Sequence, residues 1–168
     1  MKKVFVMLLA FASSLSAFSQ GKDVVDIAIG SADHTTLVAA VKAADLVSTL
    51  KGTGPFTVFA PTNAAFDKLP EGTLASLLKP ENKAQLAKIL TYHVVAGNLD
   101  ASAVVAAIKS GNGKAVLTTV SGGKLTASLD KDKVKLTDES GKSAYVTTAD
   151  LKATNGVVHV IDGVVLPK

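Results

Sequence analysis

The three histidines carry the most versatile side chains in this sequence, because a neutral imidazole can bind a metal ion or act as a general base. They are His34, His93 and His159, and they are scattered along the chain. His93 and His159 each stand in an otherwise apolar segment. A histidine in that setting is usually hydrogen-bonded inside the core. We therefore expect both imidazoles to satisfy buried backbone groups or a partner such as Thr62 or Asn63.

Other patterns that could support catalysis or ion binding are incomplete. The Asp-Lys-Asp run at 130–132 begins like a calcium loop, but it lacks the glycine at the sixth position and the closing glutamate. The run 141–143 ends like a phosphate loop, yet Leu136 stands where the first glycine is needed. There is no cysteine and no Gly-x-Ser-x-Gly motif. We predict a protein that is not an enzyme and that uses no metal and no cofactor.

Residues 1–19 have the pattern of a secretory signal peptide, with two lysines before the apolar run 4–15 and small residues near its end. We predict cleavage after Ser19. The remainder, 20–168, is long enough to bury the core of a single domain without disulfides. No later stretch approaches the roughly 20 continuous apolar residues of a membrane-spanning helix. The sequence thus predicts an exported protein that is extracellular, on the cell surface or periplasmic, with no membrane span in the mature chain.

The charge of the chain argues against nucleic acid as a partner. The formal net charge of +4 includes the two lysines of the expected leader, so the mature chain is nearer +2. Every cationic residue is lysine. Without arginine the chain lacks the bidentate fork that recognises phosphate or guanine well. We therefore predict no nucleic-acid binding.

The stretch 54–66 must build much of the core, because Phe56, Phe59 and Phe66 are the only phenylalanines outside the expected leader. Phe56 to Ala60 has the β-branched and aromatic composition of a buried strand, which a following proline should stop. Thr62 or Asn63 can then cap a short helix that carries Phe66. One stretch thus supplies a strand, a turn and the start of a helix.

The elements around this stretch change in character along the chain. Apolar spacings of three and four predict helices before it, with Asp23 and Asp33 as caps, and Asp100 should cap another. Tyr92 to Val95 reads as a short strand, and Asn155-Gly156 as a tight turn. Alternating or continuous apolar residues predict five later strands, at 115–120, 124–129, 133–137, 144–148 and 157–161. Helices followed by strands indicate the α+β class.

Three segments resemble the fasciclin (FAS1) domain family. The first runs from Phe59 through Pro61, Thr62 and Asn63 to Phe66. The second is the Tyr92-His93 pair, and the third is 155–167, which resembles the family's closing signature almost residue for residue. The resemblance implies a β-wedge of two sheets with a group of helices packed on one side. It also implies a structural signature made of residues Phe56, Phe59, Thr62, Asn63, Phe66, Asn155, Gly156 and His159.

The resemblance also implies a function, because fasciclin domains are mostly extracellular adhesion or matrix-interaction modules. The family's adhesion segments place a candidate interaction surface at Tyr92 and His93, and at Asp150 and Leu151 ahead of the closing signature. For Tyr92, a place in the core is an equal alternative, since tyrosine serves packing as often as binding. The partner implied is a cell-surface or matrix protein or a polysaccharide.

Two other functions fit the same resemblance. Some fasciclin-domain proteins hold carotenoids, so a carrier of an apolar small molecule such as a carotenoid or lipid is the alternative function. A scaffold part of an envelope or biofilm matrix, with no discrete site, is the third.

Overall fold

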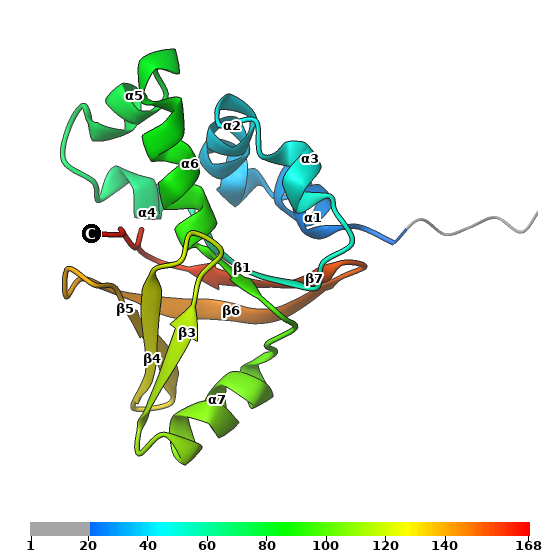
Figure 1. Ribbon diagram of the computed structural model, residues 1–168, viewed down its shortest axis with the longest axis vertical. Coiled ribbons are helices and arrows are strands. Elements are labelled where there is room, and N and C mark those ends of the chain that lie inside the picture. The colour runs from blue at the N-terminus through cyan, green and yellow to red at the C-terminus, as the bar shows by residue number, and fades with distance from the viewer. Residues whose placement is uncertain (1–20) are drawn as a thin grey trace, which may run out of the picture.

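The computed structural model describes residues 21–168, and it gathers most of the helices on one side of a strongly bent sheet (Figure 1). The expected leader, residues 1–19, lies outside the described residues. The helices, with 3₁₀ turns written η, are α1 (Val24–Ile29), η1 (Ala32–His34), α2 (Thr35–Ala43), α3 (Val47–Leu50), α4 (Asn63–Asp67), α5 (Thr73–Leu77), η2 (Pro80–Asn82), α6 (Lys83–Tyr92) and α7 (Ala101–Ser110).

The strands of the described chain form two sheets that share one long strand. They are β1 (Phe56–Pro61), β2 (Val94–Ala96), β3 (Lys114–Thr118), β4 (Lys124–Asp130), β5 (Lys133–Thr137), β6 (Ser143–Ala153) and β7 (Gly156–Ile161). Their order is β2-β1-β7-β6-β5-β4-β3. The first part of β6 pairs with β5 and the rest pairs with β7. The expected α+β wedge of two sheets is confirmed.

The outermost strands of this order, β2 and β3, meet and nearly close the assembly. Val95 and Thr119 form an antiparallel bridge. The amide of Val120 donates to the Val94 carbonyl at 2.7 Å. The two outer strands are therefore joined at this seam through residues 119 and 120, just past the end of β3.

Strand β1 lies near the centre of the molecule, as its aromatic composition predicts. It pairs antiparallel with β2 and parallel with β7, and every residue after Phe56 is buried. Parallel strands are covered on both faces, which explains why β1 and β7 are apolar almost throughout. Thr62 follows β1 and caps α4, because its hydroxyl accepts from the Ala65 amide at 3.2 Å.

The two faces of β1 contribute to two different hydrophobic cores. Val58 and Ala60 face the helices, where they pack with α1, α2 and α6. Phe59 faces the inside of the wedge, together with residues of β3, β4 and β5. The apolar face of α7, with Val104 and Ile108, closes this inner core. Figure 1 shows α7 on the side of the sheets opposite the other helices.

The β3-β4-β5 meander has one wet face, as its alternation predicts. Leu117, Leu125 and Leu136 point inward and are buried. Their neighbours Lys124 and Thr118 point outward and are exposed. The inner side of the meander is thus buried in the core between the sheets and α7. No helix of the described chain covers its outer side.

Three local predictions are wrong. Asp33 does not cap α2, since the residue at the cap position is His34, which makes no side-chain cap bond. Tyr92 belongs to α6 rather than to a strand, because the His93 ring bonds back to the Ile89 carbonyl and extends the helix end. The tight turn lies one residue early, at 154–155, so Gly156 is the first residue of β7.

Candidate functional site

Tyr92 lies at the end of α6 and is completely buried in the inner core. Its hydroxyl donates to the Lys124 carbonyl at 2.6 Å and accepts from the Glu139 amide at 3.3 Å. Burial raises the pKa of this phenol. The side chain is thus anchored at both its apolar and its polar end, and it offers no exposed area to a partner.

His93 is also buried, with 2% of its surface exposed, and both ring nitrogens have partners. Nδ1 lies 2.8 Å from the Ile89 carbonyl oxygen, and Nε2 accepts from the Val165 amide at 3.2 Å. These partners assign the neutral tautomer with the proton on Nδ1. Burial lowers the pKa to about 4, which keeps the ring neutral at pH 7. The ring therefore ties the end of α6 to the C-terminal segment.

His159 of β7 has a similar structural role in the inner core. Its ring stacks on Phe59, with centroids 5.6 Å apart. Nε2 lies 2.7 Å from the Leu99 carbonyl oxygen, and Nδ1 accepts from the Asp150 amide at 3.3 Å. The expectation that the histidines satisfy backbone groups is confirmed for both His93 and His159. The suggested partners Thr62 and Asn63 are wrong.

Asn63 instead holds the start of α2. Its side-chain oxygen accepts from the Thr36 amide at 3.0 Å, and its amide nitrogen donates to the Ala32 carbonyl at 3.0 Å. The α2 N-terminus thus receives its cap from another element, which explains how it can do without Asp33.

Of the four residues expected at the interaction surface, only Asp150 and Leu151 reach the surface. Tyr92 and His93 are buried, so they do not form the exposed surface that we expected, and the alternative place of Tyr92 in the core is the one observed. Asp150 lies in an irregular part of β6, where the register with β7 shifts twice, and it adopts a positive φ of 60°. Its carboxylate accepts from the amide of Ala101, the first residue of α7, at 2.7 Å.

An open hollow adjoins Leu151. Its volume is about 290 Å³, and it lies between α1, η1 and the irregular part of β6. The floor is apolar and contains Ile27, Leu151 and Val158. The polar groups around it come from Ser31, Asp33, His34, Thr62, Thr147 and Thr148. We call this feature the β6 hollow.

His34 lines the β6 hollow but is not available at its surface. The residue is 5% exposed, and its Nδ1 lies 2.8 Å from the Ser31 hydroxyl. Nε2 lies near the Ala60 backbone, yet it makes no well-formed hydrogen bond within residues 21–168. Burial lowers the pKa of this imidazole, which favours the neutral ring.

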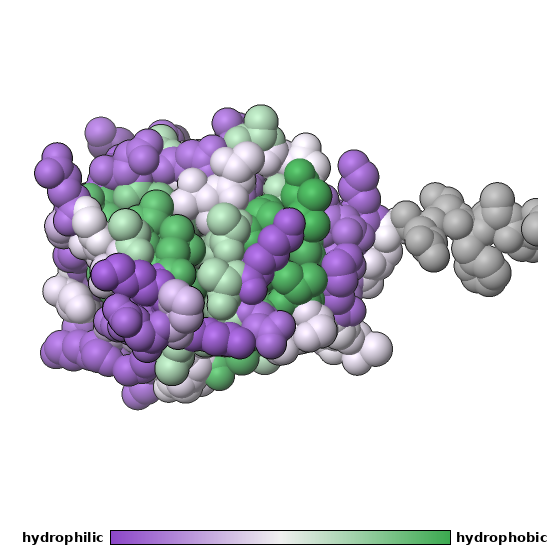
Figure 2. Space-filling view, turned by 90° about the horizontal axis from the view of Figure 1, so that it is seen from above, coloured by the Kyte–Doolittle hydropathy of each residue, from purple (hydrophilic) through white to green (hydrophobic). Residues whose placement is uncertain are grey.

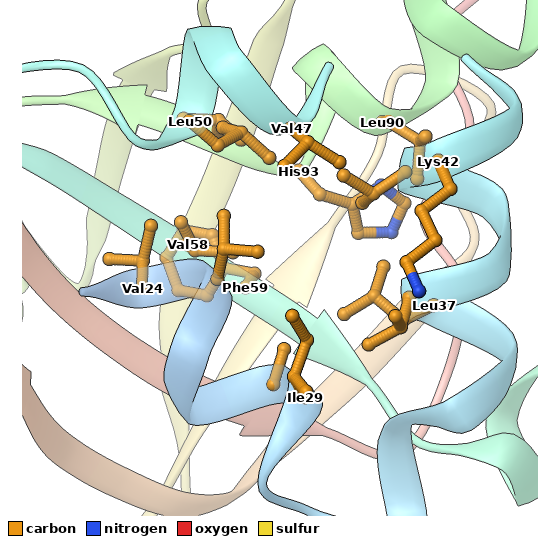
Figure 3. A pocket seen from close by; sticks show the side chains of 15 residues that line it. Val24, Ile29, Leu37, Lys42, Val47, Leu50, Val58, Phe59, Leu90 and His93 are labelled. Atoms are coloured by element: carbon orange, nitrogen blue, oxygen red, sulfur yellow. The ribbon is translucent and has the colours of Figure 1, made fainter. Parts of the chain in front are cut away.

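A second, almost wholly apolar pocket lies among the helices. Figure 3 shows side chains of α1, α2 and α3 converging above Val58 and Phe59 of β1, with His93 at the back. The enclosed volume is about 40 Å³. Lys42 is the one charged residue that lines the pocket among the described residues. Figure 2 shows the apolar surface on this helical side, bordered and crossed by hydrophilic side chains.

The sequence and the fold both match a known family. The profile of the fasciclin domain matches residues 32–167. The chain belongs to the fasciclin domain family. Protein sll1483 of Synechocystis sp. is 49% identical over 154 residues, which cover 92% of this chain and 78% of that protein. The transforming growth factor-beta-induced protein ig-h3 of Sus scrofa is 39% identical over 144 residues, which cover 86% of this chain and 19% of that protein.

A solved fasciclin structure shows the same fold. A FAS1 domain pair from the insect cell adhesion molecule fasciclin I matches with a TM-score of 0.76 and 18% identity, covering 86% of this chain and 51% of that one. At 18% identity this comparison shows a shared fold and nothing further. The family match and the likeness to ig-h3 support a coarse role for this fasciclin domain as a binding module.

Asn155 shows how the closing fasciclin signature holds the domain together. Its side-chain oxygen accepts from the Val24 amide at 3.0 Å, at the start of α1. Its amide nitrogen donates to the carbonyls of Leu50 and Gly52, at 2.7 and 2.9 Å. One side chain in the β6-β7 turn thus fixes the ends of two helices.

Asp138 is a structural residue that the sequence did not single out. It is buried in the turn between β5 and β6. One carboxylate oxygen accepts from the amides of Ser140 and Lys142, both at 2.9 Å, and the other accepts from the Leu166 amide at 3.0 Å. The burial of Asp138 could not be predicted from its polar surroundings in the sequence, because the C-terminal segment that covers it is distant in the chain.

Two general features of the fasciclin domain complete the description. Across residues 21–168, no three His, Cys, Asp or Glu side chains come close enough together to hold a metal ion. Within the same part of the chain, no helix has both the length and the apolar character needed to cross a bilayer.

Proposed function

We propose that this fasciclin domain is an exported adhesion module that contacts a cell-surface or matrix component through the β6 hollow. The observation that carries the proposal is the hollow itself, whose lining combines apolar side chains, including the partly exposed Leu151, with polar ones such as Thr147 and Thr148. Protein interfaces commonly have this anatomy, with an apolar centre and a polar surround. The family relative ig-h3 is described as a transforming growth factor-beta-induced protein, and one solved FAS1 domain pair of the same fold comes from a molecule described as an insect cell adhesion molecule.

The geometry also favours the β6 hollow over the Tyr92-His93 pair as the contact. Leu151 and the rim threonines lie on the surface, whereas Tyr92 and His93 are buried. The hydrogen bonds of the neighbouring Asp150, to α7 and to His159, hold this irregular part of β6 in one conformation. A preformed contact surface loses little conformational entropy on binding.

A retention experiment tests this proposal. Purified labelled protein is incubated with the isolated envelope of its source organism, and the bound fraction is measured. Leu151→Glu introduces a charge into the apolar floor, and we expect at least a fivefold loss of retention. Leu129→Glu is the matched control, since Leu129 is partly exposed on β4 and does not line the hollow. Equal retention of wild type and Leu151→Glu would reject the β6 hollow as the contact.

A second candidate function is a carrier of an apolar small molecule, such as a carotenoid or lipid. The apolar pocket of Figure 3 supports it, because Lys42 at its edge could neutralise an anionic end group. The free volume of about 40 Å³ admits only part of a long chain without movement of α1.

The test of the carrier function is the visible absorbance and the organic extract of protein purified from its own source. Ala28→Phe, which fills the pocket, should abolish any bound material. Colourless, lipid-free protein would reject the carrier.

A further inference from the structure

The outer face of the β3-β4-β5 meander combines hydroxyl and ammonium groups in an ordered grid. Side chains at alternate positions share this face, and the strand registers place them in rows. One row runs Val116, Thr126, Thr137, Ser143, and the next runs Lys114, Ser128, Lys135, Tyr145. Lys124 and Lys133 lie at opposite ends of the grid. We call this surface the meander face.

The lysines of the meander face are not neutralised. None of Lys114, Lys124, Lys133 and Lys135 forms an ion pair with any residue from 21 to 168. Asp130 is the carboxylate on the grid, and it accepts a hydrogen bond from the Tyr145 hydroxyl at 2.8 Å. On the grid itself, four lysines stand against one aspartate, and the carboxylates of Asp132, Asp162 and Glu139 lie at its margins.

The hydroxyl groups of the face are free to exchange hydrogen bonds with a ligand. Thr137 and Ser143 share one bond at 3.1 Å, and the side chains of Thr126 and Ser128 make none within the described chain. A hydroxyl both donates and accepts, so such a row is complementary to another array of hydroxyls. Neighbouring strands lie about 4.8 Å apart and alternate residues on one strand about 6.8 Å apart, which sets the spacing of the groups on the grid.

We propose that the meander face binds an acidic polysaccharide built of uronic-acid residues. Each such sugar carries a carboxylate and ring hydroxyls, which matches the alternation of ammonium and hydroxyl groups on the grid. The lysines supply the charge complementarity, and the row of Thr126, Thr137 and Ser143 exchanges hydrogen bonds with the ring hydroxyls. The partly exposed ring of Tyr145 supplies a surface for stacking at the edge of the grid.

Other polyanions fit this surface less well. The chain has no arginine, so the bidentate recognition of phosphate that favours nucleic acid is missing. An acidic peptide offers carboxylates but few hydroxyls, and it would leave the threonine row without partners. An anionic membrane would contact the lysines, but Val116 is the one large apolar side chain of the grid. This inference concerns a different surface from the β6 hollow, and it does not depend on the adhesion role proposed there.

Affinity measurements with polygalacturonate as the probe test the proposal, with neutral dextran as the comparison polymer. We expect binding by the purified wild-type protein at low salt, weakening as sodium chloride screens the charges. Lys133→Gln/Lys135→Gln should weaken binding at least fivefold. The matched control is Lys22→Gln/Lys152→Gln, which removes the same charge from exposed positions off the meander face. An equal loss in both double variants would overturn the proposal.

A second pair of variants separates a polysaccharide site from a merely cationic surface. Thr126→Val/Thr137→Val keeps every charge and the strand propensity but deletes two hydroxyls. We expect at least a threefold loss of affinity for polygalacturonate and an unchanged melting temperature. Unchanged affinity in this variant, or wild-type binding to polyglutamate as tight as to polygalacturonate, would overturn the assignment and identify a surface for acidic peptides or polyanions in general.

Discussion

His93 illustrates at the scale of one residue how a polar group can be part of a hydrophobic core. Its two ring nitrogens satisfy the Ile89 carbonyl and the Val165 amide, which lie 76 positions apart in the chain. Both of these backbone groups would otherwise be buried without a partner, which destabilises a folded protein. The imidazole therefore stabilises the fold by bridging two segments.

The first prediction concerns the loss of this bridge. His93→Ala should lower the free energy of unfolding by about 1 to 3 kcal/mol, because two buried backbone groups lose their partner. Urea unfolding followed by circular dichroism measures the change. Ser48→Ala, at an exposed helical position, is the control and should leave stability almost unchanged. An unchanged midpoint for His93→Ala would contradict the assigned role.

The second prediction concerns pH. The pKa of His93 is about 4 in the folded protein, against an unfolded value of 6.5. Between these values the unfolded chain binds a proton that the folded chain excludes. The contribution of His93 to stability is therefore complete above pH 6.5, and it is lost as pH falls, by up to about 1.4 kcal/mol per pH unit. Unfolding curves at pH 7, 6 and 5 measure this slope.

His93→Gln provides the comparison for the pH experiment. A glutamine amide can donate to Ile89 and accept from Val165 without titrating. The variant should lose less stability than wild type between pH 7 and 5. His34, whose pKa is also lowered by burial, contributes equally to both proteins. Identical slopes would show that the His93 ring is not kept neutral by the fold.

The sequence allowed the roles of His93 and His159 to be predicted, because a histidine among apolar residues points to internal hydrogen bonding. The sequence did not decide whether Tyr92 lies in the core or on the surface. The family's adhesion pattern predicted Tyr92 and His93 on a surface, but both are buried. The deciding contacts of Tyr92 are with the Lys124 carbonyl at the start of β4 and the Glu139 amide in the β5-β6 turn, both distant in sequence. Local pattern carries no information on such contacts.

At the scale of elements, the parallel pairing of β1 with β7 depends on Gly156. This residue pairs with Phe56, and a Cβ built at Gly156 would overlap the Phe56 carbonyl oxygen. The backbone approach, rather than a positive φ, is what demands glycine here. The sequence signal Asn-Gly was interpreted as a turn, but the turn lies one residue earlier and the reason for the glycine is the adjoining strand.

The third prediction follows from this close approach. Gly156→Ala should destabilise the protein by about 3 kcal/mol, since the two central strands must separate to admit the methyl group. Faster amide hydrogen exchange in β1 and β7 should accompany the loss. Gly30→Ala is the control, because its φ of −74° is ordinary and its added Cβ, 3.3 Å from the Asp26 carbonyl oxygen, needs a shift of only a few tenths of an ångström. Equal stability of the two variants would disprove the steric account.

Most elements could be predicted from their own sequence, and the failures share one cause. The capping of α1 by Asp23 and of α7 by Asp100 is confirmed, as is the alternation of the meander. The start of α2 was misjudged because Asn63, from a later helix, supplies its cap. The irregular part of β6 and its hollow could not be foreseen, since register shifts depend on the partner strand.

At the scale of the whole molecule, the two cores share the strands β1, β2 and β7. Val58 and Ala60 belong to the helical core and Phe59 to the inner core, so neither core can lose β1 and remain intact. We therefore expect the domain to unfold as a single cooperative unit.

Tyrosine emission provides the fourth prediction. The chain has no tryptophan and two tyrosines. In a Tyr145→Phe variant the remaining Tyr92 reports on the inner core, whereas circular dichroism at 222 nm reports mainly on the helices. The two signals should change at the same urea concentration. Midpoints that differ beyond experimental error would show that the cores unfold separately.

The seam between β2 and β3 has a consequence for assembly. A free sheet edge is a template on which a second chain can add a strand, and this route leads to domain swapping and fibrils. Here the Val95-Thr119 bridge and the Val120 amide bond occupy the two edges with one another. At high protein concentration, strand addition by a second copy should therefore be disfavoured where these two bonds join the edges.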